Sequence, residues 1–478
     1  MKGTVDAVGA RALMPSNTLA TLIGLTPDDV DVEYFYCDEN LQSIDWALDL
    51  DLVAITGYTL HSDRIERISR AWRERGVPVA LGGAFATLNS EQARKLCDHH
   101  FIGEGEYTWP QFLREFVAGN AKPLYKQKTR INMHDSPPPN WFFIDAGDYL
   151  YMTVQTSRGC PNRCDFCDAI QLVGRKHRRK TIDQIMVEIS NAQQAGAETI
   201  FFSEDNFHVS EKTTKELLNR IIDWNTSLAH PVQFSCQTSM RIADNEEIIK
   251  LLADARFAAA FIGLESTRKE CLEEVNKGQL YRDDAVERIK LLSSYGILPF
   301  LGMIVGFDND DEETFKEIEG FLSETGSPIA SLSVLNAPTG TPLYSRLDEQ
   351  GRIDDNFAGF WHFSTNIKPL QWTLDELLKK HRGLFRRLYE PENFEQRTLT
   401  WLSNVNYFST LYTKKRRTGS NLKKIARILY HYSFRVPPPV RTQFFRVLKK
   451  TWDMDPRLIR KAITIMTQYC HYYDFSRS

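Results

Sequence analysis

The stretch RGCPNRCDFC, residues 158–167, is the most informative part of the chain, because three cysteines lie within eight positions at C-x3-C-x2-C spacing. It follows a strand-like run, residues 151–156, and a turn after that strand can bring three thiolates to one inorganic centre. A tetrahedral zinc site needs a fourth Cys or His nearby, yet the next cysteine is Cys236 and the nearest histidine, His177, lies in a basic run. Three ligands without a fourth suit a [4Fe–4S] cluster with one open iron. A zinc knuckle and three unrelated structural cysteines remain as alternatives.

The cysteine spacing, together with Phe166 just before the last cysteine, resembles the signature of the radical S-adenosylmethionine (SAM) enzymes. The resemblance implies that Cys160, Cys164 and Cys167 hold the cluster. It also implies that the open iron takes the amino and carboxylate groups of SAM. An electron from the cluster then cleaves the sulfonium to a 5′-deoxyadenosyl radical, which requires an external donor of the flavodoxin or ferredoxin type.

The composition is that of an ordinary globular chain, with 42% apolar and 25% charged residues among 478. This length predicts two or three domains. No apolar run reaches transmembrane length and Met1 is not followed by a signal-peptide segment, which predicts a cytoplasmic protein. Eight cysteines, three of them clustered, favour a reducing compartment over a disulfide framework.

The net charge of −3 hides an asymmetry, since residues 401–478 carry 16 Lys+Arg and 3 Asp+Glu, a balance of +13. The rest of the chain therefore carries −3 − 13 = −16. The basic part contains Lys414-Lys415-Arg416-Arg417 and three predicted helices, at residues 422–432, 441–452 and 456–469. In the first of these, Ile425, Ile428, Leu429 and Tyr432 share one face. Intramolecular packing is the commonest use of such helices. Peripheral contact with the inner face of a membrane is the next alternative, and nucleic acid ranks last because no base-reading aromatic pattern is present.

Residues 1–125 alternate between strand-like and helix-like segments. Strands are predicted at 32–37, at 52–58, at 77–81 and just before Gly103, with helices at 63–75 and 90–97. This βαβ rhythm predicts a parallel sheet with ligands beyond the carboxyl ends of its strands. Glycines stand at those ends, where they serve either as tight-turn residues or as points of close backbone approach to a ligand.

This region resembles the cobalamin-binding domain that precedes the radical domain in one branch of the superfamily. The matching residues are Gly57 and Tyr58, the pair Gly82-Gly83, and Gly103 with Glu104. The resemblance assigns all six to cobalamin. The usual opening strand of that domain is missing from the start of this sequence. Residues 98–103 spell D-x-H-x-x-G, the pattern by which other cobalamin enzymes supply a histidine to cobalt, but they follow the wrong strand, so we interpret the match as coincidence.

Residues 151–345 repeat a strand–helix unit, with further strands predicted at 199–203, 232–236, 259–264, 298–305 and 331–335. A helix at 182–196 is predicted to be capped by Thr181. Together with the strand before the cysteines this makes six strands, which resembles the partial (β/α)6 barrel of radical SAM enzymes.

Polar groups and glycines at successive strand ends match the SAM contacts of that family. Ser203, Glu204 and Asp205 stand where the family binds the SAM amino group. Gln237 and Arg241 follow the next strand, and Arg241 is a forked donor for the SAM carboxylate. Glu265 is a candidate acceptor for the ribose hydroxyls, and Gly302, Ile304 and Gly306 resemble the strand that meets adenine.

The remainder, residues 346–478, resembles the C-terminal extension of cobalamin-dependent radical enzymes such as the hopanoid methylases, and Thr373 with Glu376 forms a predicted capping box. We therefore predict an α/β protein in four parts. These are a Rossmann-like cobalamin domain (1–125), a linker (126–150), a partial TIM-like radical SAM barrel (151–345) and a mainly helical extension (346–478).

Three functions remain open from the sequence. The first is cobalamin-dependent methylation of an unactivated carbon in a small or lipid-like substrate. The second uses the same radical chemistry for ring closure, carbon–carbon coupling or rearrangement. The third is an iron–sulfur binding or electron-carrying protein without SAM turnover, which the polar strand ends speak against. The cofactors expected for the first are a [4Fe–4S] cluster, SAM and cobalamin.

Overall fold

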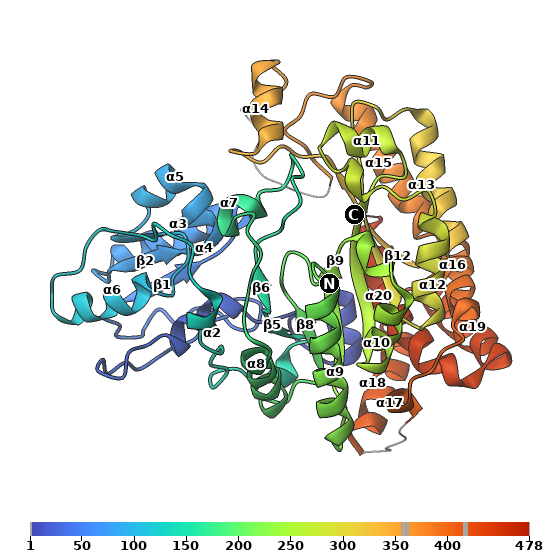
Figure 1. Ribbon diagram of the computed structural model, residues 1–478, viewed down its shortest axis with the longest axis horizontal. Coiled ribbons are helices and arrows are strands. Elements are labelled where there is room, and N and C mark those ends of the chain that lie inside the picture. The colour runs from blue at the N-terminus through green and yellow to red at the C-terminus, as the bar shows by residue number, and fades with distance from the viewer. Residues whose placement is uncertain (1, 355–356, 358–362, 414–418, 478) are drawn as a thin grey trace.

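The computed structural model describes residues 2–354, 357, 363–413 and 419–477, and side chains at 2–3, 412–413 and 419–422 are left out of the description. Figure 1 shows an N-terminal α/β part on the left, a six-stranded sheet in the centre and C-terminal helices on the right. The basic run 414–417 lies outside the described residues.

The N-terminal part is a four-stranded parallel sheet with the order β1-β2-β3-β4. Its elements are α2 (Asn17–Gly24), β1 (Val53–Thr56), η1 (Thr59–His61), α3 (Ser62–Arg73), β2 (Val79–Gly82), α4 (Gly83–Leu88), α5 (Ser90–Lys95), β3 (His99–Ile102), α6 (Thr108–Val117) and β4 (Leu124–Lys126). The preceding helix, α1 (Lys2–Val8), packs on the C-terminal helices instead. The strands predicted at 52–58 and 77–81 and the helices at 63–75 and 90–97 are confirmed.

The strand predicted at residues 32–37 is wrong, because this described segment runs without any strand pairing. Its aromatic side chains pack on other parts of the chain instead. Tyr34 lies edge-on to Phe143 of the linker, with ring centroids 5.8 Å apart, and Tyr36 packs against the main hydrophobic core. The first strand of the described sheet is therefore β1.

The segment from 126 to 150 is extended, with the short turns η2 (Met133–Asp135) and η3 (Ala146–Asp148). Trp141 and Tyr149 are buried in the main core and fix the segment to it. Near its end, Ala12 pairs with Tyr149 in a parallel bridge, so the N-terminal segment runs beside this part of the chain.

The central sheet has six parallel strands in the order β12-β11-β10-β9-β8-β5. The strands are β5 (Met152–Val154), β8 (Thr199–Phe202), β9 (Gln233–Thr238), β10 (Phe257–Glu265), β11 (Leu298–Val305) and β12 (Ile329–Val334). All six predicted strands are confirmed. Most are apolar runs, as expected for strands covered by helices, whereas β9 reads QFSCQT and is mostly polar.

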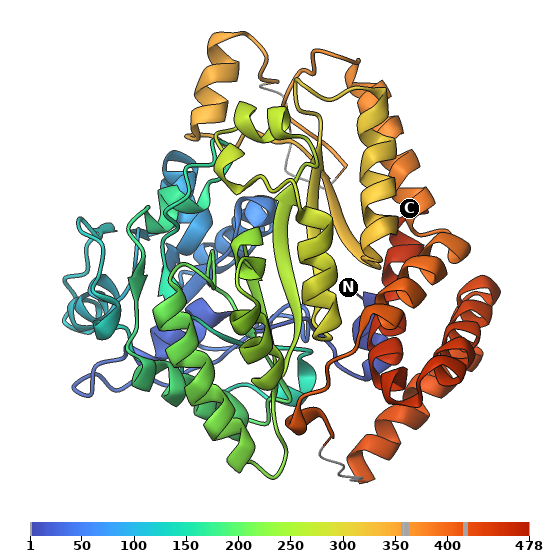
Figure 2. The ribbon, with the colours of Figure 1, turned by 45° about the vertical axis from the view of Figure 1, so that its right-hand side comes forward.

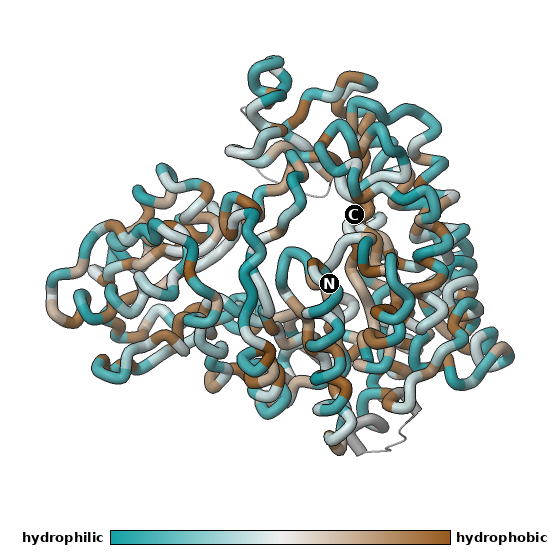
Figure 3. The backbone as a smooth tube through the Cα atoms, viewed as in Figure 1, coloured by the Kyte–Doolittle hydropathy of each residue, from teal (hydrophilic) through white to brown (hydrophobic). Residues whose placement is uncertain are grey.

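Helices and turns connect these strands and cover the sheet (Figure 2). They are α7 (Ala169–Val173), α8 (Ile182–Gln194), α9 (Glu211–Ser227), η4 (Met240–Ala243), α10 (Glu246–Asp254), α11 (Lys269–Glu274), η5 (Gly278–Leu280), α12 (Ala285–Ser294) and α13 (Glu312–Thr325). Thr181 caps α8 in a capping box with Gln184, as predicted for Thr181. Figure 3 shows hydrophobic segments along the central strands and mixed hydropathy along the covering helices, the amphipathic pattern of a layered core.

The C-terminal part is helical and continues the main hydrophobic core. It contains α14 (Pro342–Glu349), α15 (Leu374–Leu388), α16 (Pro391–Asn404), α17 (Thr410–Thr413), α18 (Gly419–Phe434), α19 (Pro438–Met454), η6 (Pro456–Leu458) and α20 (Ile459–Phe475). Thr373 and Glu376 form the predicted capping box of α15. Tyr472 of α20 stacks on Tyr389 at 4.8 Å and meets Phe300 of β11 at 6.4 Å, so α20 packs directly on the sheet.

The face predicted for the helix at 422–432 is only half correct. Ile428 and Tyr432 are buried, whereas Ile425 and Leu429 are exposed. In the described part of the chain, no helix combines the length and apolarity needed to cross a membrane.

Candidate functional site

The cysteine loop begins at the end of a two-stranded antiparallel ribbon, β6 (Ser157–Arg158) paired with β7 (Arg178–Arg179). Gly159, between the ribbon and Cys160, has a φ of +95°. A Cβ atom there would lie 2.4 Å from the carbonyl oxygen of Lys176 and 3.0 Å from that of Gly174. Only glycine allows both this backbone conformation and this approach, so Gly159 fixes where the loop starts.

The three cysteines share this loop and are at least half-buried. The Cys167 N–H donates to the Cys164 carbonyl at 3.2 Å, which closes the loop between them. Burial raises the pKa of all three thiols, that of Cys167 to about 12. Such thiols become thiolates when a metal centre takes them as ligands.

Across the described ranges, no three His, Cys, Asp or Glu side chains are placed to ligate one single metal ion. The donor set on the loop consists of three thiols, and thiolates are the usual ligands of iron–sulfur clusters.

Two neighbouring carboxylates at the end of β8 face different ways. Asp205 accepts a hydrogen bond from the Gly159 N–H at 3.2 Å, so it contacts the start of the cysteine loop. Glu204 is buried and accepts from the Thr156 N–H at 3.2 Å and the Thr156 hydroxyl at 3.0 Å. Burial raises the pKa of both carboxyls, that of Glu204 to about 7. Glu204 thus joins the ends of β5 and β8, and Ser203 is bonded through its N–H to Val154.

One row of side chains crosses the sheet near these ends. Phe261 of β10 is paired in register with Gln237 of β9 and with Phe300 of β11, so the three lie on one face. Gln237 is exposed although Cys236 and Thr238 beside it are buried, whereas Phe300 contacts Tyr472 of α20, so this face is open only on the side of Gln237. The two phenyl rings meet edge-on at 5.0 Å. Arg241, in η4, is exposed.

The strands predicted to hold adenine and ribose converge on the cysteine loop. Gly302 of β11 is paired with Gly263 of β10, and a Cβ at Gly302 would lie 3.1 Å from the Phe261 ring. Ile304 and Phe166 pack against the same small hydrophobic cluster, which places the residue before the last cysteine beside β11. Gly306, with a φ of +100°, donates its N–H to buried Asp310 at 2.6 Å.

Lys277 is a site residue that the sequence did not reveal. Its buried ammonium donates to the Gly263 carbonyl at 3.0 Å and pairs with Glu265, which has the unusual φ of +66°. It also lies 6.0 Å from the centroid of the Phe166 ring. Although burial raises the pKa of Cys160 and Cys164, the Lys277 charge opposes that rise. Lys277 stands in a loop after α11 without a recognisable motif, so only the fold reveals its position.

A helix contact brings the end of β2 close to the segment that follows the cysteine loop. Helix α4, which starts at Gly83, packs on α7, which follows Cys167. Gly83 has a φ of +84°, and a Cβ there would lie 2.3 Å from the Thr56 hydroxyl. Tyr58 follows Gly57 and is 63% exposed. Burial, and after it the charges of Asp168 and Asp205, raise the pKa of Tyr58.

Glu104 has contacts that differ from those predicted for it. It lies in a buried ion network that joins the two domains, in which Arg158 and Arg178 donate to it at 3.0 and 2.9 Å, and the Ile131 N–H at 3.0 Å. Arg158 also pairs with Glu106 at 2.7 Å. Both carboxylate oxygens of Glu104 are therefore engaged within the protein, and it holds the ribbon that carries the cysteine loop. Gly103, beside it, has a φ of +88° and closes the turn after β3.

The histidine of the D-x-H-x-x-G match also has a hydrogen-bond partner within the protein. His100 is buried, and its Nε2 lies 2.8 Å from the carbonyl oxygen of Ala86. Asp98 accepts from the Val79 N–H at 2.9 Å. Both residues hold the N-terminal sheet together.

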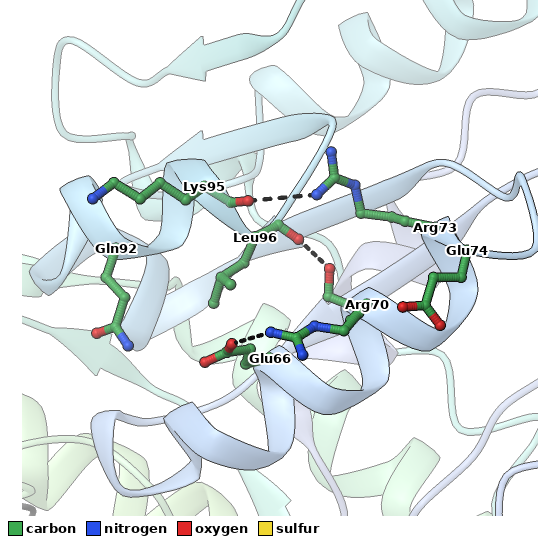
Figure 4. Close-up of a pocket in the computed structure, with 8 residues that line it drawn as sticks. Glu66, Arg70, Arg73, Glu74, Gln92, Lys95 and Leu96 are labelled. Carbon is green, nitrogen blue, oxygen red and sulfur yellow. Dashed lines mark hydrogen bonds and ion pairs between the residues drawn. The ribbon is translucent and has the colours of Figure 1, made fainter.

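A surface pocket between α3 and α5 lies apart from this site (Figure 4). It is lined by charged side chains that pair with one another, such as Arg70 with Glu66 at 2.8 Å. None of the residues predicted from the sequence to bind a cofactor lines it.

Two family models match the chain. Residues 154–322 match the radical SAM superfamily, and residues 341–478 match a domain of unknown function, DUF4070. The chain thus carries a radical SAM domain at residues 154–322, and such a domain implies an enzyme with a [4Fe–4S] cluster and SAM as its cofactors.

Among curated proteins, an uncharacterized methyltransferase of Synechocystis sp. is 28% identical, over 98% of this chain and 88% of that protein. The hopanoid C-2 methylase of Rhodopseudomonas palustris is 27% identical, over 86% of this chain and 78% of that protein.

Among solved structures, the radical SAM methyltransferase TsrM of Kitasatospora setae, with tryptophan and a SAM analogue, has a TM-score of 0.60 at 17% identity, covering 78% of this chain and 83% of that one. The same enzyme with cobalamin and a [4Fe–4S] cluster has a TM-score of 0.56 at 16% identity, covering 88% of each chain. The predicted α/β fold, with a partial barrel sheet of six parallel strands and a helical C-terminal part, is therefore confirmed.

Proposed function

We propose that this enzyme is a cobalamin-dependent radical SAM methyltransferase that methylates an unactivated carbon of a small or lipid-like molecule. The observation that carries the proposal is the packing of α4, which begins at Gly83 directly after β2, on α7, which follows Cys167. A corrin at the strand ends of the N-terminal sheet would then lie next to a cluster and SAM at the radical sheet. The names of the two curated relatives support methyl transfer, and the TsrM structure with cobalamin supports the second cofactor.

The residues of the chain have distinct roles in this proposal. Cys160, Cys164 and Cys167 ligate the cluster, and Asp205 accepts from the SAM amino group beside them. Arg241 and Gln237 take the SAM carboxylate, Glu265 the ribose, and the backbone of Gly302–Gly306 the adenine. Once bound, the cluster and SAM supply the radical that abstracts hydrogen, and methylcobalamin supplies the methyl group. The protein positions these groups and excludes water.

The cobalamin contact is proposed for the glycine turns. Gly57, Gly82 and Gly83 leave backbone without side chains at the ends of β1 and β2, where a large planar ring can approach. His100 is bonded to the main chain, so it is not available to cobalt in this arrangement. Glu104 is left out of the proposed contact set because its oxygens hold Arg158 and Arg178.

The face of the radical sheet that carries Gln237 and Phe261 supports a substrate with apolar parts, although Tyr472 of α20 contacts Phe300 at one side. Phe261, Phe300 and Phe201 are half-buried on the sheet, and the first two form an edge-to-face pair beside Gln237. An apolar floor with one amide at its margin suits a lipid-like molecule with few polar groups.

The test is a metal count combined with a product analysis. We expect protein purified anaerobically with hydroxocobalamin and reconstituted with iron and sulfide to hold about four irons and about one cobalt per chain. With methyl-labelled SAM, a reductant and a substrate, it should yield 5′-deoxyadenosine, S-adenosylhomocysteine and labelled product. Iron without cobalt would contradict the cobalamin proposal, and 5′-deoxyadenosine without methyl transfer would favour ring closure or rearrangement.

A Gly82→Leu variant separates the two cofactors. Gly82 has an ordinary φ of −138°, and a Cβ there would lie 3.4 Å from Phe101, so the backbone tolerates a side chain. The leucine would fill the space at the end of β2, and the variant should lose most of its cobalt while it keeps its iron. Gly320→Leu is the matched control, because Gly320 lies in α13 with open space around it. Equal cobalt in the two variants would remove the case for this corrin position.

A Lys277→Met variant should shift the midpoint potential of the cluster to more negative values, on the order of tens of millivolts. A nearby cation stabilises the reduced cluster, which carries one more negative charge, and this substitution removes the cation. The measurement is a redox titration of the reconstituted protein followed by electron paramagnetic resonance. Lys277→Arg keeps the charge and should keep the potential. Equal potentials in the methionine variant and the parent would show that Lys277 only supports Glu265.

A further inference from the structure

The hairpin of α18 and α19 uses its inner side for packing on the rest of the protein. Tyr432 of α18 stacks on Phe444 of α19 with ring centroids 4.0 Å apart, and both rings are buried. Val440 and Val447 of α19 are buried on the same side. Both helices therefore pack within the protein through this side.

The outer side of the same hairpin is also apolar. Of the eighteen large apolar side chains exposed on the described surface, seven lie within residues 425–454, so they are concentrated on this hairpin. They recur at helical spacing, with Phe434 71% exposed and Trp452 62% exposed. The seven are Ile425, Leu429, Tyr430, Phe434, Phe445, Trp452 and Met454.

The spacing of these side chains makes continuous stripes. Ile425 with Leu429, and Tyr430 with Phe434, are four positions apart on α18, and the second pair is in contact with ring centroids 5.3 Å apart. Phe445 and Trp452 are seven positions apart on one face of α19. Each helix thus presents a second apolar face to solvent, opposite or beside its buried one.

The charge around these stripes is mainly positive. Residues 423–454, which carry the stripes, contain 8 Lys+Arg and one acidic residue, the exposed Asp453. Some of the cations fix the hairpin to the body, such as Lys450, which pairs with buried Glu395 of α16 at 2.6 Å. Lys423, Arg435 and Lys449 are exposed next to the apolar stripes. A surface that combines a net positive charge with exposed aromatic and aliphatic side chains complements an anionic surface with an apolar interior.

We infer that the outer side of the α18–α19 hairpin, defined by Ile425, Leu429, Tyr430, Phe434, Phe445 and Trp452, docks on an anionic lipid bilayer. The helices lie in the interface, with the apolar side chains inserted at the level of the headgroups and the Lys and Arg side chains extended to the phosphates. Aliphatic residues such as Ile425 and Leu429 contribute to insertion but have no use in stacking on nucleic acid bases, which separates this surface from an RNA-binding one. This inference does not depend on the proposed reaction.

The test is co-sedimentation of the full-length reconstituted protein with lipid vesicles. The parent should bind vesicles of phosphatidylcholine with phosphatidylglycerol, bind pure phosphatidylcholine at least about tenfold more weakly, and release from the mixed vesicles as salt is added. A triple variant, Tyr430→Ser, Phe434→Ser and Trp452→Ser, should bind the mixed vesicles at least about tenfold more weakly than the parent does. The three replaced side chains are exposed, so the variant should keep the fold of the parent. Thermal unfolding of both proteins checks this.

A control variant with Val117→Ser and Phe142→Ser removes two equally exposed apolar side chains from the N-terminal half and should bind like the parent. Equal binding by the triple variant and the parent would overturn the inference. So would RNA binding tighter than vesicle binding at equal phosphate concentration. A parent dimer that the triple variant converts to a monomer would assign the surface to self-association instead.

Discussion

Replacement of Cys164 by Ala should leave the reconstituted protein without its iron–sulfur absorption and with little bound iron. Cys164 is the middle one of the three cysteines of the loop, and two thiolates do not hold a [4Fe–4S] cluster with one open iron. The variant should also make no 5′-deoxyadenosine from SAM. The measurements are an iron and sulfide count, a visible spectrum and a product assay under anaerobic conditions.

The matched control is Cys236→Ala. Cys236 is equally buried, but it lies within β9 and serves as a core residue of the radical sheet. Its truncation removes one sulfur atom from the core and should keep the full iron content. A full iron complement in the Cys164 variant would refute the ligand assignment, and iron loss in both variants would mean that the assay reports stability instead of ligation.

The strands and helix caps of the radical sheet could be predicted because the residues that determine them are close together in the sequence. Five of the six strands are mainly apolar runs, β9 being the exception, and the helix caps at Thr181 and Thr373 are set by side chains three positions away. The segment 32–37 has the same local appearance, yet it forms no strand. Strand pairing depends on a partner distant in sequence, and Tyr34 and Tyr36 find contacts with the linker and the main core instead.

The sequence predicts which strand ends carry the site residues, but it does not predict the directions of their side chains. The sequence places Glu204 and Asp205 together after β8, but adjacent side chains point to opposite sides of the chain. Glu204 turns inward to Thr156 and Asp205 toward Gly159. The sequence also gives no sign of Lys277, whose position depends on how the loop after α11 docks. There the Val275 carbonyl accepts a hydrogen bond from the Asp165 N–H at 2.9 Å.

The basic run at residues 174–180 shows that the sequence also does not reveal which charged side chains are buried. A run of cations in a sequence usually indicates a solvated surface, but here two of its members are buried in ion pairs. Arg178 pairs with Glu104 of the N-terminal part, and Lys180 pairs with Glu188 of α8. The ribbon pairing of β6 with β7 turns these side chains inward, and this pairing is not visible in the composition of the run.

Because Arg158 stands at the centre of this buried network, its replacement by Met should destabilise the protein by about 3–5 kcal/mol at neutral pH. The substitution removes the partner of Glu106 and one of the two arginines that neutralise Glu104. A buried carboxylate without its cation costs far more than the pair contributes. Urea unfolding of the apo-protein under reducing conditions measures the effect without interference from cluster loss.

The destabilisation by Arg158→Met should also depend on pH in a defined direction. Burial raises the pKa of Glu104, but the hydrogen bonds from Arg178 and the charge of Arg158 outweigh it, so the pKa lies below its usual value. In the parent, Glu104 therefore contributes stability above about pH 4.5, the unfolded value, and this contribution is lost as the pH falls through the folded value. The variant lacks one of the cations that lower the pKa of Glu104, so it loses less stability as the pH falls. The difference in the free energy of unfolding between parent and variant should therefore shrink from neutral to acidic pH. Arg114→Met is the control, since it breaks an exposed pair with Asp29 and should leave the unfolding midpoint unchanged. A difference that stays constant across this pH range would mean that Arg158 acts through packing and not through its charge.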